Sequence, residues 1–118
     1  MGSGEAHWDR VAALEAMGAR GDRTAVPELL AVLDGDKECW HTRTAAVHAL
    51  VALGAEDAGP AILKLLARDG DPDVREAAVD ALGALRCRQA VRLLERIVAG
   101  DPSEDLRGRA ARALARLR

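Results

Sequence analysis

The sequence predicts an all-α protein, an α-solenoid of about three and a half helical-hairpin repeats. Alanine, with 25 residues, and leucine, with 16, dominate the 118-residue chain, and both are good helix formers. No segment alternates apolar and polar residues over a useful length, as a half-buried strand would. A short segment instead recurs four times at nearly constant spacing, which is typical of helical repeats.

The recurring segment is clearest at residues 74–85, which read VREAAVDALGAL. Related copies occur at 9–18, 42–53 and 106–117. One arginine marks the same position in every copy, with separations of 33, 32 and 32 residues: Arg10, Arg43, Arg75 and Arg107. Each copy has apolar residues four apart, which predicts one apolar stripe on a first helix, here called A.

A second apolar segment begins 16 residues after each of the first three marker arginines, at 26–33, 59–66 and 91–98. It predicts a second helix, called B, in each repeat. The expected order is A1-B1-A2-B2-A3-B3-A4, without a B4. We therefore predict a single domain over residues 1–118. Its repeats cover about 5–35, 36–69 and 70–100, followed by a half repeat at 101–118.

Helix starts and ends are also predicted. Asp71 and Asp101 each precede a proline, as an N-cap before the first helical position does, and Glu104 lies at capping-box spacing from Asp101. Gly18 and Gly54 fall where A1 and A2 should end, as left-handed C-caps. Two prolines stand in the first turns of B helices, where a missing N–H costs little: Pro27 and Pro60.

Residues 71–85 match the pattern Asp-Pro-x-Val-Arg-x-x-Ala-x-x-Ala-Leu-Gly-x-Leu almost position for position. In this they resemble the HEAT-like repeats of the phycobilin-lyase type, and the resemblance extends from about Trp8 to Leu117. Arg92 departs from it, standing where helix B would carry proline, and Ala115 stands where the last A helix would carry glycine. The repeats predict a right-handed, slightly curved stack with A helices on the convex face and B helices on the concave face.

Two sets of residues are expected to hold this stack together. Ten apolar residues should form the core: Leu14, Leu29, Leu33, Leu50, Ile62, Leu66, Leu82, Leu94, Val98 and Leu114. In similar repeats the marker arginine pairs with a loop aspartate of its own or the neighbouring repeat. The resemblance thus implies a structural ladder between the marker arginines and three loop aspartates: Asp36, Asp69 and Asp101.

Charge is distributed unevenly. The net charge of −2 does not suggest a general nucleic-acid binder, but residues 1–59 carry −5 and residues 60–118 carry +3. On A4, Arg109, Arg112 and Arg116 are spaced to form one stripe. This stripe is either a possible anion-binding site or the polar outside of a terminal helix, which solenoids need for solubility.

The predicted concave groove runs from acidic to basic along the B helices. Glu28 lies at its acidic end. The predicted anchor for an acidic segment of a partner protein consists of four cations: Lys64, Arg68, Arg92 and Arg96. The alternative interpretation is that these are ordinary solvated positions.

Histidines and cysteines do not predict a site. His41 and His48 lie about 10 Å apart along one helix, which is too far to bind one ion. Cys39 and Cys87 should lie about 24 Å apart, so we expect two free thiols and no metal or cofactor. His7 does not complete a set of metal ligands with them. Two aromatic residues can either anchor the packing or form exposed binding hot spots: Trp8 and Trp40.

Such repeats serve as interaction surfaces in many unrelated proteins, so we expect a non-enzymatic, protein-binding scaffold or adaptor. Nucleic-acid or other polyanion binding through the arginine-rich C-terminal half is the alternative. The resemblance also leaves open a chromophore-lyase-like enzyme.

No apolar run approaches the roughly 18 residues of a membrane span, and a cytoplasmic location is expected. We favour a monomer over a homodimer, although A4 presents apolar residues: Leu106, Ala110, Leu114 and Leu117.

Overall fold

The computed structural model describes residues 3–35 and 38–118. These contain seven α-helices and no strand: α1 (Ser3–Ala19), α2 (Val26–Asp34), α3 (Trp40–Ala52), α4 (Gly59–Arg68), α5 (Pro72–Ala84), α6 (Val91–Gly100) and α7 (Glu104–Leu117). A short 3₁₀ helix precedes each even-numbered helix: η1 (Arg23–Ala25), η2 (Glu56–Ala58) and η3 (Arg88–Ala90).

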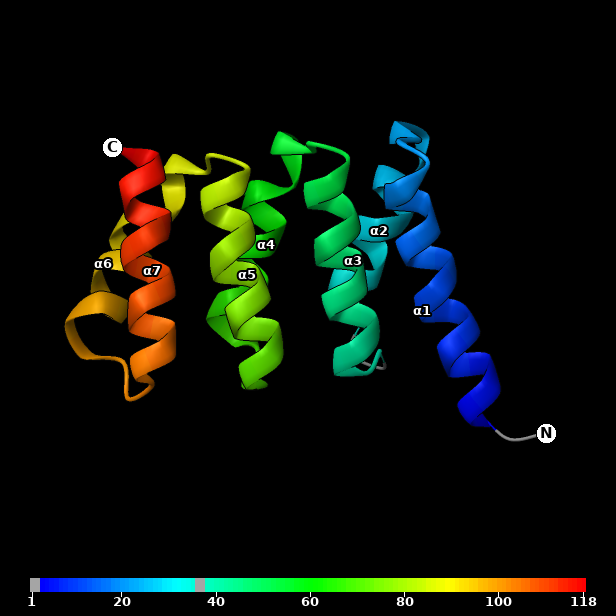
Figure 1. Cartoon of the computed structure of the whole chain (residues 1–118), viewed down its shortest axis with the longest axis horizontal. Coiled ribbons are helices and arrows are strands. Elements are labelled where there is room, and N and C mark those ends of the chain that lie inside the picture. The colour runs from blue at the N-terminus through cyan, green and yellow to red at the C-terminus, as the bar shows by residue number, and fades with distance from the viewer. Residues whose placement is uncertain (1–2, 36–37) are drawn as a thin grey trace.

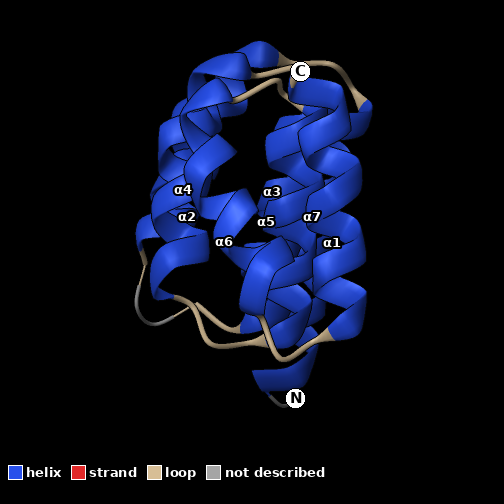
Figure 2. Ribbon diagram, turned by 90° about the vertical axis from the view of Figure 1, so that its left-hand side faces the viewer, coloured by secondary structure: helices blue, strands red, loops and turns tan. Residues whose placement is uncertain are grey.

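The helices form two layers, as Figure 1 and Figure 2 show. The A layer consists of α1, α3, α5 and α7, side by side, and the B layer consists of α2, α4 and α6. The stack extends 46 Å along its longest axis and 19 Å along its shortest. The predicted all-α solenoid and its helix order are therefore confirmed.

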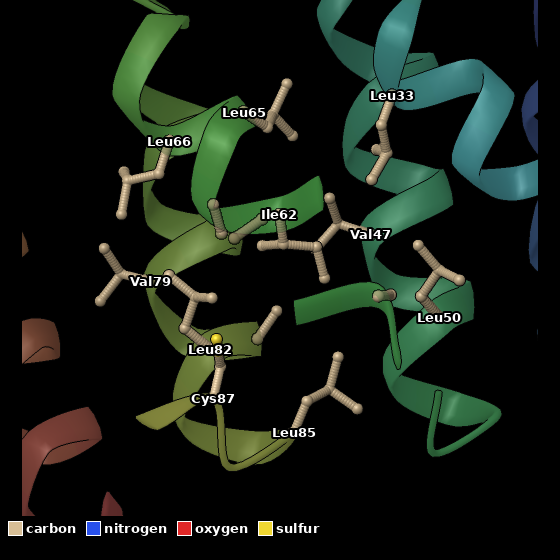
Figure 3. Close-up of a cluster of buried hydrophobic side chains, with 14 of the residues drawn as sticks. Leu33, Val47, Leu50, Ile62, Leu65, Leu66, Val79, Leu82, Leu85 and Cys87 are labelled. Atoms are coloured by element: carbon tan, nitrogen blue, oxygen red, sulfur yellow. The ribbon is translucent and has the colours of Figure 1, made fainter. Parts of the chain in front are cut away.

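The core lies between the two layers. Figure 3 shows Ile62 of α4 and Leu82 of α5 in one cluster with Val47 and Leu50 of α3. Nine of the ten predicted core residues are buried. The prediction for Val98 is wrong, because its side chain is 38% exposed.

The exposure of Val98 has a structural cause. Leu33 and Leu66 stand 23 residues after their marker arginines, as Val98 does, and both are buried. Helices α2 and α4 each have a following B helix in the stack, whereas α6 is the last B helix in the described part of the chain. The outer side of α6 is therefore left open at Val98.

Close helix packing in the A layer depends on glycine. A Cβ atom on Gly18 would lie 2.9 Å from the Cα of Ala49, and one on Gly83 would lie 2.9 Å from the Cα of Ala113. Gly18 therefore allows α1 to approach α3 and is not the predicted C-cap. The left-handed residue after α1 is Gly21, with φ of 69°, whereas Gly54 has the predicted left-handed conformation.

The predicted N-caps are confirmed at one site and wrong at the other. The Asp71 side chain accepts from the backbone N–H groups of Asp73 and Val74 at the start of α5. At α7 the N-cap is Ser103, whose hydroxyl oxygen accepts from the N–H of Leu106. Asp101 stands six residues before its marker arginine, as Asp69 does, so it belongs to the loop and not to the helix start.

The other predicted helix starts are as expected. Pro27 and Pro60 lie in the first turns of α2 and α4.

Candidate functional site

The B layer has three exposed cations besides Arg68: Lys64, Arg92 and Arg96. Lys64 of α4 and Arg96 of α6 stand at the same position of successive repeats. Arg92 lies four residues before Arg96, on the same side of α6. None of the three forms an ion pair with a described residue. We call Lys64, Arg92 and Arg96 the B-face patch. The exposed Glu28 of α2 lies at the other end of this layer, so the predicted change from acidic to basic follows the order of the helices.

Arg68 is also exposed but has a structural contact. Its guanidinium Nη2 donates a hydrogen bond to the carbonyl of Leu33, near the C-terminal end of α2. It also lines a cavity of about 240 Å³ at the loop end of the stack, together with Arg43 and Asp69. The contact connects two repeats, and Arg68 is therefore left out of the B-face patch.

The three arginines of the predicted stripe on α7 differ in their ion pairs. Arg109 forms ion pairs with Asp80, Asp105 and Glu76, at 2.9 Å to Asp105 and 3.4 Å to Glu76. Its charge is thus compensated within the chain. Arg112 and Arg116 have no ion pair among the described side chains. With Arg109 and Asp80 they line a cavity of about 230 Å³.

The carboxylates around Arg109 influence one another. Burial raises the pKa of Glu76 above its ordinary value, and a hydrogen bond with Asp105 adds to the effect. The hydrogen bond from Arg109 lowers the pKa of Asp105 below its ordinary value. Three carboxylates thus share the single positive charge of Arg109.

Three of the marker arginines pair with acidic side chains of the loops between helices. Arg43 Nε lies 2.7 Å from a carboxylate oxygen of Asp69, and Arg75 Nη1 lies 3.3 Å from one of Asp101. Arg10 pairs with Glu38, and the predicted partner Asp36 lies outside the described residues. Charge-assisted bonds of this kind hold loops to helices, so the structural role predicted for the ladder is supported.

Arg107 adds a contact within its own repeat. Its guanidinium donates a hydrogen bond of 2.6 Å to the backbone carbonyl of Asp101.

Cys39 directly precedes α3 and Cys87 follows α5, and the two form no disulfide with each other. Burial acts to raise the pKa of the Cys39 thiol, but hydrogen bonds with Thr42 and the His41 backbone, together with the charge of Arg43, lower it below its ordinary value. Within the residues that the structure describes, no three His, Cys, Asp or Glu side chains are grouped to hold a metal ion. None of the described helices combines the length and apolar character that crossing a membrane requires.

The two tryptophans form an aromatic cluster with His41. The ring of Trp40 stacks on His41 at 3.5 Å between centroids, and Trp8 meets the same ring edge-on at 4.8 Å. Trp8 is 55% exposed and Trp40 is 36% exposed. The sequence alone left the exposure of both tryptophans open, because a residue at the start of an A helix can face either the layer or solvent.

Trp40 also lines a groove that sequence analysis did not identify. The groove has a volume of about 270 Å³ and lies on the outer face of the A layer. Its lining combines residues of α3, α5 and α7: Trp40, Thr44, His48, Asp73, Glu76, Ala77, Asp80 and Arg109. The only available signal was the four-residue spacing of Trp40, Thr44 and His48, which places them on one side of α3.

Comparison with known protein families matches residues 4–69 and 59–118 to HEAT repeats. No curated protein matches the chain. The match is to HEAT repeats in general, so the narrower phycobilin-lyase type stays a prediction. Because the two matched segments together span nearly all of the sequence, the chain belongs to the HEAT-repeat family.

Proposed function

We propose that the domain is a non-enzymatic protein-binding scaffold whose B-face patch holds an acidic segment of a partner protein. The observation that carries the proposal is that Lys64, Arg92 and Arg96 are exposed cations of one layer without an ion pair in the described part of the chain. Such charges attract an acidic partner from solution, whereas the compensated Arg109 does not.

The B layer also has a polarity that would orient the partner. Glu28 and Asp34 are exposed on α2, at the end opposite the B-face patch. A graded surface of this kind contributes to association rate and orientation more than to affinity. Solenoids use extended layers of this type as binding surfaces. The two described cysteines form no disulfide, which suits the reducing cytoplasm that the sequence predicts.

Charge reversal tests the proposal. A labelled peptide of alternating glutamate and glycine is mixed with the protein in a stopped-flow instrument at low salt. Arg92→Glu together with Arg96→Glu should slow association about tenfold or more, since electrostatic steering contributes 10- to 1,000-fold. Both side chains are exposed, so the melting temperature should change little.

The matched control is Arg112→Glu with Arg116→Glu, which changes the net charge equally on α7. This control should slow association by less than about threefold. If the control slows association as much as the test variant, bulk charge explains the binding and the B-face patch is not the site. If only the control has an effect, the stripe on α7 is the site. A fall in DNA affinity with salt steep enough for several phosphate contacts would instead support the polyanion alternative.

A further inference from the structure

We propose that the groove of Trp40 on the A layer binds an arginine-bearing segment of a partner protein. This site is separate from the B-face patch, because it lies on the other layer of the stack. One wall comes from α3 and the other from α5, with Arg109 of α7 at the margin.

The charge of the groove favours a cation. Its lining includes three carboxylates and one arginine: Asp73, Glu76, Asp80 and Arg109. Arg109 is shared between Asp80, Glu76 and Asp105. Asp73 is exposed and forms no ion pair with a described residue. The groove therefore has an excess of negative charge that its own arginine does not compensate, and a second cation would complement it.

The aromatic wall favours arginine over other cations. Trp40 is 36% exposed, and its exposed part lines the groove. His41 stacks against the indole ring and so fixes its orientation. A guanidinium group can lie flat on an indole ring and still donate N–H groups in its own plane to carboxylates. Asp73 and Glu76 lie on the opposite wall, where they can accept such bonds.

Thr44 has an unsatisfied polar atom beside the groove. It lines the same groove, and its Oγ1 atom is buried without a hydrogen-bond partner among the described residues. Because that oxygen is shielded from solvent, a donor group of a bound segment reaches it only after the Thr44 side chain changes its rotamer. The groove thus combines an exposed tryptophan with an excess of carboxylates, and these two features carry the proposal.

Tryptophan fluorescence provides a direct test, since the chain contains two Trp residues and no Tyr or Phe. In a Trp8→Phe protein, emission comes from Trp40 alone. An acetylated and amidated peptide of alternating arginine and glycine should change this emission in a saturable manner. The same peptide with lysine in place of arginine should bind more weakly, because an ammonium group does not stack as a plane.

Paired variants decide whether the groove is responsible. Asp73→Asn with Glu76→Gln should weaken peptide binding about tenfold, which corresponds to the loss of two charged contacts. The control Glu56→Gln with Asp57→Asn removes the same charge from exposed positions of η2 and should weaken binding less than about threefold. Equal losses in the two variants, or no saturable change of emission, would overturn the proposal.

A further control separates this site from the proposed function. Arg92→Glu with Arg96→Glu should leave binding of the arginine peptide unchanged, because those residues lie on the B layer. If this reversal alters arginine-peptide binding as strongly as the Asp73 and Glu76 variant does, the peptide responds to overall charge and the groove is not its site.

Discussion

At the scale of single residues, burial in this molecule is set by the neighbouring repeat as much as by residue type. Leu33, Leu66 and Val98 are apolar and occupy the same position of successive B helices. The first two are 1% and 2% exposed, whereas Val98 is 38% exposed. An apolar side chain stabilises the fold through the area it removes from water. The three side chains should therefore contribute differently to the free energy of unfolding.

Alanine substitution at two of these positions measures the difference. Leu66→Ala should lower the free energy of unfolding by about 2–5 kcal/mol, because it leaves a cavity between the layers. Val98→Ala should lower it by less than about 1 kcal/mol, since the side chain is partly in water already. Urea unfolding followed by circular dichroism gives both values. A loss at Val98 as large as that at Leu66 would mean that the outer side of α6 is covered in solution.

At the scale of helices, the sequence predicted which segments are helical and how they follow one another, because apolar spacing and repeat length report directly on these features. It did not predict how closely the helices approach. Gly18 reads as a helix end, but α1 continues to Ala19 and the left-handed turn falls at Gly21. Its contact with Ala49 joins residues far apart in the chain, which no local pattern reveals. The Trp40 groove was missed for the same reason.

Close packing of α5 on α7 should therefore depend on Gly83. In Gly83→Val the new Cβ would lie 2.9 Å from the Cα of Ala113, and backbone cannot yield as a flexible side chain does. Separation of the helices should cost about 1–3 kcal/mol. Thermal unfolding measures the loss. The control is Gly100→Ala, where no atom lies within 4 Å of the new Cβ, and it should leave stability unchanged or slightly higher. Similar losses in both variants would contradict the packing role of Gly83.

At the scale of the whole molecule, the two layers present different chemistry to solvent. The B-face patch lies on the B layer, whereas the carboxylates and Trp40 of the groove lie on the A layer, as do Arg112 and Arg116 of α7. Large exposed apolar side chains in the described part of the chain are limited to Trp8, Trp40 and Val98. Trp8 and Trp40 lie together around His41, whereas Val98 lies apart from them on α6. Two partly exposed indole rings and one valine do not make the large continuous apolar patch that drives stable self-association.

The prediction at this scale is a monomer. The apolar side of α7 is not available to a second copy, because Leu106, Ala110 and Leu114 are buried within the chain and Leu117 is half-buried. Sedimentation equilibrium at micromolar protein and physiological salt should give a mass near 12.5 kDa. A dimer mass would contradict the prediction. Repeating the measurement on Val98→Asp would then show whether the open side of α6 is the contact, since a buried carboxylate at that interface would restore the monomer. A dimer that persists in this variant and dissociates at high salt would instead indicate that the oppositely charged A and B layers of two copies meet.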